Sequence, residues 1–420
     1  RNMNKAGKFL TGLLVFLTLT ISSGYSSSFF TGYAGGMLNL GADSSASQYN
    51  PELDFTAFFS GQFSYSENFW SHLEFSIETE DLFDQSLFSK TDSAFQVDEL
   101  SFIKRNPTLN GSNYFSAYMG TYDPIGSDIF LQRYFGIEAI GTKLAESYLG
   151  LAGSILYPHF GIGIADVIKP STKPTAYGFY LYLNNENSQY YILNADLRFA
   201  TSLRYFTFDI CGGIGAPLYD TYKGESIFLV ISKIYLHAGT TMLLGNNYTT
   251  SLFLQAGLFN TSYQKGSSWE LATDSIYLLL EPRFRTKNSH INLSIYALPQ
   301  TTVDKFLFVD DTLGVDLNIY SDTIPISAKM YTMGVHLGFG LPGKSILSFF
   351  PTNKSDPNDN LANLIQSIKS LNFDVNVTPY IATEIFGGEI NAQLKLKIMD
   401  FVNKEWYKAF SAEVGYRVKF

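Results

Sequence analysis

An alternation of apolar and polar side chains, repeated along most of the chain, constrains the fold more than any other feature. The C-terminal run FSAEVGYRVKF, residues 410–420, has an apolar side chain at every second position and three charged residues between them. Successive side chains of an extended chain point to opposite faces, so a period of two indicates a β-strand. This run therefore predicts a strand with one apolar and one polar face.

The same pattern returns over the whole chain, with clear examples at 52–65, 191–199, 276–285, 311–320 and 390–398. These segments suit the ~9–11 residues of a membrane-spanning strand better than the ~5–6 residues of a common soluble strand. In a bilayer every backbone amide needs an internal partner, and a closed sheet provides one because it has no edge. We therefore predict an all-β fold, a single transmembrane antiparallel up-and-down barrel, apolar outside and polar inside.

Composition agrees with a barrel and argues against several other classes. The chain has 420 residues, with 28 Tyr, 36 Phe and only 16% charged residues, which is too polar for a bundle of membrane helices and rich in aromatics for a soluble enzyme. The single cysteine, Cys211, excludes an internal disulfide. The net charge of −9 gives no electrostatic basis for binding nucleic acid.

The sequence shows no catalytic or metal-binding pattern. The five histidines are scattered without motif spacing, and adjacent Ser71 and His72 in one strand would face opposite sides. We therefore expect no enzyme activity, no cofactor and no metal.

The N-terminus has the order of a secretory signal peptide. Arg1, Lys5 and Lys8 precede an uncharged run from Phe9 to Ile21, and small residues follow. The apolar run is shorter than the ~20 residues that a spanning helix needs. We predict a signal peptide at 1–26, with cleavage after Gly24 as the alternative, and a barrel domain at 27–420.

Together these features resemble the outer-membrane β-barrels of diderm bacteria, at the level of the porin-like class. In that class an alternating last strand ending in an aromatic residue is the signal for barrel assembly, and Tyr416 and Phe420 match it here. The resemblance implies the cell outer membrane as location, reached by export through the inner membrane and periplasm. It implies membrane lipid and the barrel-assembly machinery as partners, and leaves a homo-oligomer open.

The number of strands follows approximately from the pattern. Twenty-one segments resemble strands. The alternation is weak between 133 and 184, which includes the predicted strands 133–143 and 147–156, and between 225 and 245, so some of these segments must be merged. Single-chain bacterial barrels favour even numbers, so we predict about 18 strands, within a range of 16–20. A barrel of this size is too wide for side chains to fill, and water should enter it.

The function predicted from these features is a porin-like channel for passive diffusion of small hydrophilic solutes. Its inward rows would set selectivity through their charge. The predicted pore-lining residues are Glu74, Asp196, Arg198, Glu281, Arg283, Arg285, Asp316, Lys395, Lys397, Glu413 and Arg417.

One connection stands where general porins fold a loop into the barrel to narrow it. The resemblance implies this role for the run DPIGSDIFLQRY, with Asp123 and Asp128 as the acidic side of a constriction and Arg133 as the nearest base. An ordinary exposed loop is the alternative. Short links at 66–68 and 286–289 should be periplasmic turns.

Other functions stay open. The barrel could be a surface-exposed scaffold, an adhesin or antigen with a closed lumen. The run SSASQYNPEL at 44–53 suggests a FadL-like transporter of hydrophobic substrates, although it leads directly into a strand. A helical spacing at 356–371 predicts a short helix that either plugs the lumen or lies on its rim.

Overall fold

A computed structural model gives the fold of most of the chain. It describes residues 29–42, 51–79, 81–83, 95–145, 159–185, 190–222, 224–246, 248–266, 269, 275–303, 308–326, 329–342, 373–403, 405 and 408–420. The predicted signal peptide, the predicted strand at 147–156 and the predicted helix at 356–371 lie outside these residues.

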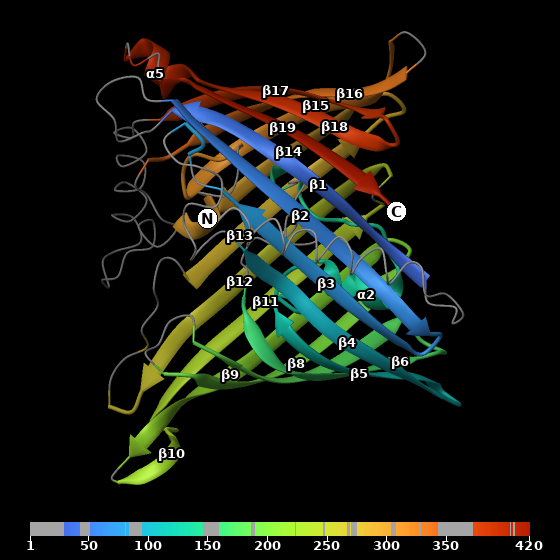
Figure 1. The fold of residues 1–420 in the computed structure, drawn as a ribbon, viewed down its shortest axis with the longest axis vertical. Helices are drawn as coiled ribbons and strands as arrows, with labels where there is room; N and C mark the ends of the chain where they lie inside the picture. Colours follow the sequence, from blue (N-terminus) through green and yellow to red (C-terminus); the bar gives the residue numbers. More distant parts are fainter. Residues whose placement is uncertain are drawn as a thin grey trace, which may run out of the picture.

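The described strands form one closed antiparallel barrel (Figure 1). β1 (Phe29–Ala42) pairs on one side with β2 (Pro51–Ser66) and on the other with β19 (Phe410–Lys419), which closes the ring. The remaining strands pair in sequence order: β3 (Phe69–Glu78), β4 (Gln96–Thr108), β5 (Gly111–Gly120), β6 (Gly161–Pro170), β7 (Thr175–Asn184), β8 (Ile192–Leu203), β9 (Phe206–Tyr222), β11 (Lys233–Gly245), β12 (Thr250–Gln264), β13 (Ile276–Arg285), β14 (His290–Ala297), β15 (Leu313–Ile326), β16 (Lys329–Gly340), β17 (Asp374–Ile385) and β18 (Gly388–Lys397).

The wall contains eighteen of the described strands. β10 (Glu225–Leu229) is the exception, because it forms a short hairpin with the end of β9 while β9 continues in the wall against β11. The predicted all-β barrel of about 18 strands is confirmed. The blurred strand predicted at 225–234 is in fact β10 and the first residues of β11.

The two faces of the wall differ as the alternation predicts. On β8, Leu197 points outward and is 70% exposed, whereas its neighbour Arg198 points inward and is 3% exposed. On β13, Phe284 is exposed outside and Glu281 is buried inside. An exposed apolar outer surface and a polar inner surface are the two faces of a transmembrane barrel.

The two ends of the barrel differ in the length of their connections. At one end the strands join through short turns, such as 109–110 and 286–289, and the predicted turn at 66–68 lies at this end too. At the other end lie the long connections, including 121–160 and 341–373. We call these the short-turn end and the long-connection end.

The predicted strand at 133–143 is wrong. The segment contains α2 (Ile129–Phe135), which ends where Gly136 adopts a left-handed conformation, and a short 3-10 turn, η1 (Lys143–Ala145). A left-handed glycine is a common helix end. The other described helices are α3 (Gln300–Val303) and α5 (Ile398–Val402), and none of the described helices is long and apolar enough to cross a membrane.

Candidate functional site

Residues 121–145, between β5 and β6, lie inside the barrel, with α2 seen within the ring in Figure 1. We call them the first luminal segment. Arg133 in this segment binds Glu99 of β4, and Tyr277 of β13 binds the carbonyls at Ile125 and Gly126. Because β4 and β13 lie on nearly opposite sides of the ring, the segment crosses the lumen.

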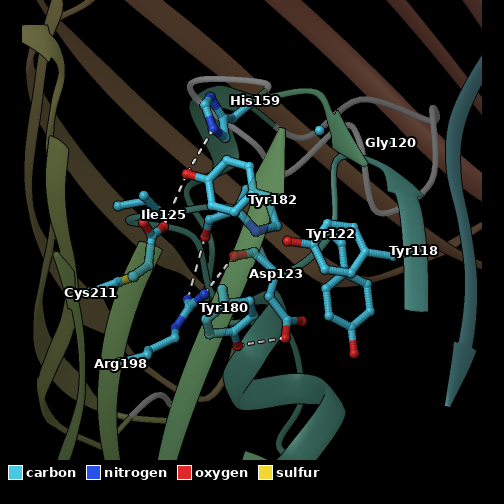
Figure 2. Close-up of a pocket in the computed structure, with 13 residues that line it drawn as sticks. Tyr118, Gly120, Tyr122, Asp123, Ile125, His159, Tyr180, Tyr182, Arg198 and Cys211 are labelled. Carbon is cyan, nitrogen blue, oxygen red and sulfur yellow. Dashed lines mark hydrogen bonds between the residues drawn. The ribbon is translucent and has the colours of Figure 1, made fainter. Parts of the chain in front are cut away.

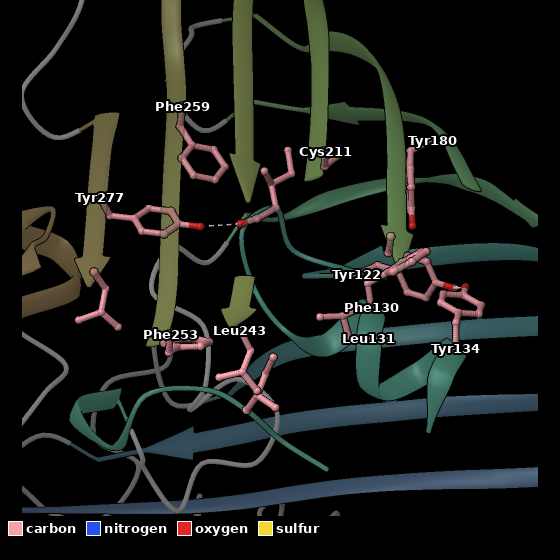
Figure 3. Close-up of a cluster of buried hydrophobic side chains, with 14 of the residues drawn as sticks. Tyr122, Phe130, Leu131, Tyr134, Tyr180, Cys211, Leu243, Phe253, Phe259 and Tyr277 are labelled. Carbon is pink, nitrogen blue, oxygen red and sulfur yellow. Dashed lines mark hydrogen bonds between the residues drawn. The ribbon is translucent and has the colours of Figure 1, made fainter. Parts of the chain in front are cut away.

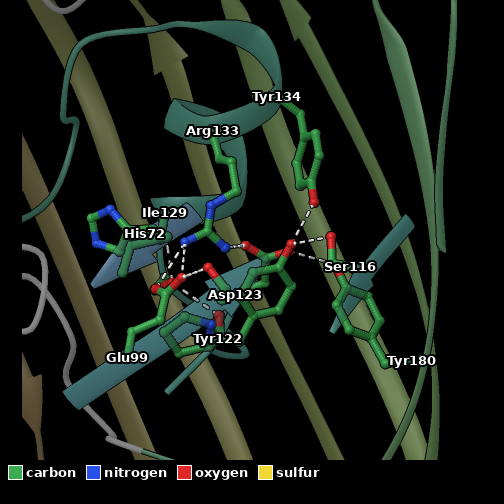
Figure 4. A network of polar contacts seen from close by, with 12 residues as sticks. His72, Glu99, Ser116, Tyr122, Asp123, Ile129, Arg133, Tyr134 and Tyr180 are labelled. Atoms are coloured by element: carbon green, nitrogen blue, oxygen red, sulfur yellow. Dashed lines mark hydrogen bonds and ion pairs between the residues drawn. The ribbon is translucent and has the colours of Figure 1, made fainter. Parts of the chain in front are cut away.

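An ion-pair network holds the segment to β4 (Figure 4). The Arg133 guanidinium donates to both carboxylate oxygens of Glu99, at 2.7 and 2.8 Å, and also to Asp123. Burial alone would lower the pKa of Arg133, but these two carboxylates raise it well above its ordinary value. The guanidinium therefore stays charged although it is largely buried.

A second buried pair holds the segment to β8 and β9. Arg198 donates through Nε to Asp209 at 2.8 Å, and through a terminal nitrogen to the Asp123 carbonyl oxygen at 2.5 Å. Its guanidinium also lies 4.5 Å from the ring centroid of Phe130. One arginine of the wall thus contacts both a wall carboxylate and the backbone of the inserted segment.

The returning part of the segment is held by β13. Arg283 donates to Glu281 at 2.7 Å and to the carbonyl oxygen of Gly141 at 3.0 Å. Glu281 also accepts hydrogen bonds from Thr142 and, at 2.5 Å, from Ser294. Charged side chains from β4, β8 and β13 therefore hold the segment at both of its limbs, and Asp209 of β9 fixes Arg198.

Apolar packing fills the space between the segment and the wall (Figure 3). Phe130 and Leu131 of α2 are fully buried and belong to the same cluster as Phe253 and Tyr277 of the wall. Gly126 has a left-handed backbone, and a Cβ at this position would overlap the Tyr277 hydroxyl. Part of the interior that the sequence predicts to hold water is therefore packed.

The segment reaches the short-turn end of the barrel. The Lys169 ammonium, close to the turn after β6, donates to the Tyr134 carbonyl at 2.5 Å. The Tyr248 hydroxyl, in the turn after β11, donates to Glu138 at 2.9 Å. The first luminal segment therefore extends through the lumen from the long-connection end, where β5 ends.

A second connection also turns inward, between β14 and β15. Its described residues are 298–303 and 308–312, and we call them the second luminal segment. Phe308 stacks on His336 of β16, with ring centroids 3.7 Å apart, and Asp310 binds Lys395 of β18 at 2.6 Å. A Cβ at Gly340 would overlap the Asp311 carboxylate, so a glycine in β16 permits this close approach.

A small cavity lies between the first luminal segment and the wall (Figure 2). Its volume is about 20 Å³, which suits a single water molecule. Its lining includes the Asp196 carboxylate, which binds Tyr182 at 3.0 Å and His237 at 2.6 Å, and His159 lies beside Tyr182. In the part of the chain that the structure describes, no three metal-binding side chains are placed to hold a metal ion.

The predicted pore-lining residues occupy inward rows of the wall, and the two segments contact some of them. Arg198, Glu281 and Arg283 meet the first segment, while Lys395 and Lys397 meet the second. The others bind neighbours on the wall: Glu74 to Ser60, Asp196 to His237, Arg285 to Tyr320, Asp316 to His336, Glu413 to Gln393 and Arg417 to Glu389.

The predicted constriction residues lie within the first luminal segment. Asp123 and Arg133 are brought together as a pair, whereas Asp128 faces away from them. Asp128 accepts hydrogen bonds from the backbone N–H groups of Ile140 and Gly141, and burial raises its pKa. Asp128 thus joins the two limbs of the segment.

The residues of the predicted assembly signal lie in the wall where it closes. The Tyr416 hydroxyl lies 3.3 and 3.2 Å from the carbonyl oxygens of Ile385 and Phe386. Phe420 stacks on Phe59 and exchanges backbone hydrogen bonds with Gly32 of β1.

Sequence reasoning missed several residues that hold the segments. Glu99 and Asp209 are inward positions of strands that the alternation does locate, so their charge was an available signal. Tyr277 and Asp310 gave no such signal, because their partners lie far along the chain.

Comparisons with known proteins return structures but no sequence relatives. No protein-family model matches the chain, and no curated protein matches it. The structure is similar to Pseudomonas putida OprB at high pH, with 7% identity, a TM-score of 0.43 and 94% of each chain covered. It is also similar to a mutant of Rh. blastica porin, with 7% identity and a TM-score of 0.39 over 94% of this chain and 100% of that one.

A third similar structure is a loop-deletion mutant of OmpT, an outer membrane protein of Vibrio cholerae. It has 8% identity and a TM-score of 0.37, over 94% of this chain and 99% of that one. The proposals below rest on the geometry of the chain itself.

Proposed function

We propose that the protein is an outer-membrane channel for small hydrophilic solutes, narrowed by the first luminal segment. The observation that carries the proposal is the closed wall with an apolar outer face and a charged inner face, crossed by a segment that charged side chains hold in place. An apolar outer face matches lipid, and a charged inner face is stable where water reaches part of it.

The wall between β18 and β2 supports a path for solutes. Inward-facing Asn39, Gln62 and Asn391 on this part of the wall are polar and partly exposed. The contacts described above instead place the first segment against β4 to β13 and the second against β16 to β18. A polar surface beside the two segments suits hydrated solutes.

The proposal includes the location and partners that the sequence suggests. The apolar outer face would contact outer-membrane lipid, and the last strand, with Tyr416 and Phe420, would be read by the barrel-assembly machinery. A signal peptide at 1–26 would direct export. Homo-oligomers are compatible with this arrangement.

Planar-bilayer recording of the purified protein tests the channel. We expect discrete conductance steps, and larger ones in the triple variant Glu99→Gln, Asp123→Asn, Arg133→Gln, because this variant removes the charges that hold α2 to β4. The matched control is His290→Gln with Asp322→Asn, which removes a contact between β14 and β15 that touches neither the segment nor the proposed path. Absence of openings in every form would exclude a channel.

A surface scaffold with a closed lumen is the second candidate, and the packed aromatic cluster inside the barrel favours it. Vesicle swelling with sugars of increasing size separates the two functions. A channel passes the small sugars and a scaffold passes none. A FadL-like transporter stays untested, since only Pro51 to Leu53 of the run at 44–53 lie in described wall residues.

A further inference from the structure

Three side chains of the wall surround one carboxylate of the second luminal segment. The Asp310 Oδ1 atom lies 2.6 Å from Lys395 Nζ and 3.3 Å from Lys397 Nζ. Asn376 Nδ2 donates to Oδ2 at 2.9 Å. The two ammonium groups contact one carboxylate oxygen and the amide N–H contacts the other. This set of donors suits a carboxylate or a phosphate group.

These donors come from the wall itself. Lys395 and Lys397 occupy successive inward positions of β18, and Asn376 lies directly opposite Lys397 on β17. Lys395 is only 3% exposed, so its charge depends on a buried anion partner, which is Asp310. Lys397 is 37% exposed and Asp310 17%, so water reaches the same group of atoms.

Several other carboxylates lie near Asp310, and their negative charges disfavour the docked position of the second luminal segment. Asp311, Asp374 and Asp400 all belong to the same electrostatic neighbourhood, and Lys408 is a further cation near Asp400. Burial would raise the pKa of Asp310, but Lys395 and Lys397 hold it below its ordinary value. Burial, Asp374 and Asp310 raise the pKa of Asp311 to about 6, and its Oδ2 atom is buried without a partner.

We propose that Lys395, Lys397 and Asn376 form a luminal binding site for small anions, carboxylates or phosphates, which the chain's own Asp310 occupies. A solute anion competes with Asp310, and its binding releases the second luminal segment from β17 and β18. The inference deepens the channel function, because it assigns anions as a solute class with a site of their own. Ionised Asp311 is repelled by Asp310 and Asp374, which weakens docking of the segment and so assists replacement of Asp310 by a solute anion.

Binding to the purified protein in detergent tests the site without any need for conductance. Asp310→Asn removes the internal competitor with little change of shape. We therefore expect inorganic phosphate or acetate to bind this variant at least about tenfold more tightly than the wild type, which corresponds to about 1.4 kcal/mol of binding free energy. Asp310→Asn with Lys395→Gln should lose this gain. Asp322→Asn, which removes another inward acid, is the matched control and should bind as the wild type does.

Hydrogen exchange of the wild type gives an independent readout if a variant folds poorly. Phosphate or acetate should speed exchange of the amides at 308–312 and leave those at 129–135 unchanged. Binding of phosphate alone or acetate alone would identify which anion the site takes. Equal anion affinity in Asp310→Asn and Asp322→Asn, with exchange at 308–312 unaffected by either anion, would overturn the site.

The anion-site proposal and the channel proposal can be tested separately. Anion binding without discrete openings would keep the site and exclude the channel. Discrete openings together with equal affinity for phosphate and acetate in Asp310→Asn and Asp322→Asn would keep the channel and exclude the anion site.

Discussion

The two luminal segments differ in how the barrel holds them. The first is packed on β4, β8, β9 and β13, with buried arginines and a fully buried helix face. The second is anchored at Asp310 by Lys395, which is buried, and by Lys397, which is partly open to water. Its apolar side chains are buried in the same cluster as those of the first: Leu298, Val303, Phe308 and Val309. The segments therefore differ in their polar anchors: the Arg198 pair of the first is closed to water, whereas Lys397 at the anchor of the second is 37% exposed.

If the proposed anion site is right, one wall carries both a fixed and an exchangeable insertion. Removing one partner of a buried ion pair leaves an uncompensated charge and is strongly destabilising, whereas a pair that water reaches contributes little. The predictions below use this contrast, starting with the largest expected effect.

Arg198→Met should be the most damaging single change. It leaves the buried Asp209 carboxylate without its cation and removes a donor to the Asp123 carbonyl, so we expect a loss of about 3–5 kcal/mol in the free energy of unfolding. Urea unfolding of the protein in lipid vesicles measures it. Lys397→Met, at the partly exposed pair, should cost about 1 kcal/mol or less. Equal losses in the two variants would contradict the contrast.

Tyr277→Phe should have an intermediate effect. It removes the hydroxyl that binds the carbonyls at Ile125 and Gly126 and leaves buried acceptors unsatisfied, at a cost of about 1–3 kcal/mol. The control is Tyr296→Phe, a buried tyrosine for which the described residues provide no hydrogen bond to the hydroxyl. If both substitutions had the same effect on urea unfolding, the hydroxyl would not anchor the segment.

The docking of the second luminal segment should depend on pH, with an effect smaller than those of the substitutions above and confined to residues 308–312. The pKa of Asp311 is about 6 in the docked state, against an ordinary value of 3.8. The contribution of Asp311 to docking is therefore complete at a pH below 3.8 and is lost as the pH rises through about 6. Asp310, whose pKa is lowered, acts oppositely and only at more acid pH. Hydrogen exchange at 308–312, corrected for intrinsic rates, should increase a few-fold from pH 5 to 7.

Asp311→Asn is the control for this effect. It should remove the rise in exchange between pH 5 and 7 and slow exchange at neutral pH. A rise that persists in the variant would show that another group titrates.

Tyr248→Phe should have the smallest effect. The hydrogen bond from Tyr248 to Glu138 lies at the solvent-exposed rim, where water replaces it. Urea unfolding should be unchanged within error. A clear loss would mean that the first segment depends on its contact at the short-turn end rather than on its buried arginines.

The wall was predictable from local alternation, and an inward course of 123–134 only from the resemblance to porins. The second segment and the contacts that hold both segments were not predictable. The face of a strand residue follows from local alternation, so the outward Leu197 and inward Arg198 could be assigned from adjacent positions. The 133–143 region was mistaken for a strand because its wall partners are distant in sequence and no local pattern encodes them: Glu99 binds Arg133, and Arg283 binds the Gly141 carbonyl. Asp310 meets Lys395 across 85 positions, which is equally invisible to periodicity.

Thiol modification during single-channel recording tests the central claim most directly, that water fills a path along the inner face of the wall. In a Cys211→Ser background, a charged water-soluble reagent should react at Asn391→Cys, an inward position, and reduce the current. It should not react at Leu394→Cys, an exposed outward position of the same strand. Equal reaction at both positions, or an unchanged current after modification at position 391, would contradict the account.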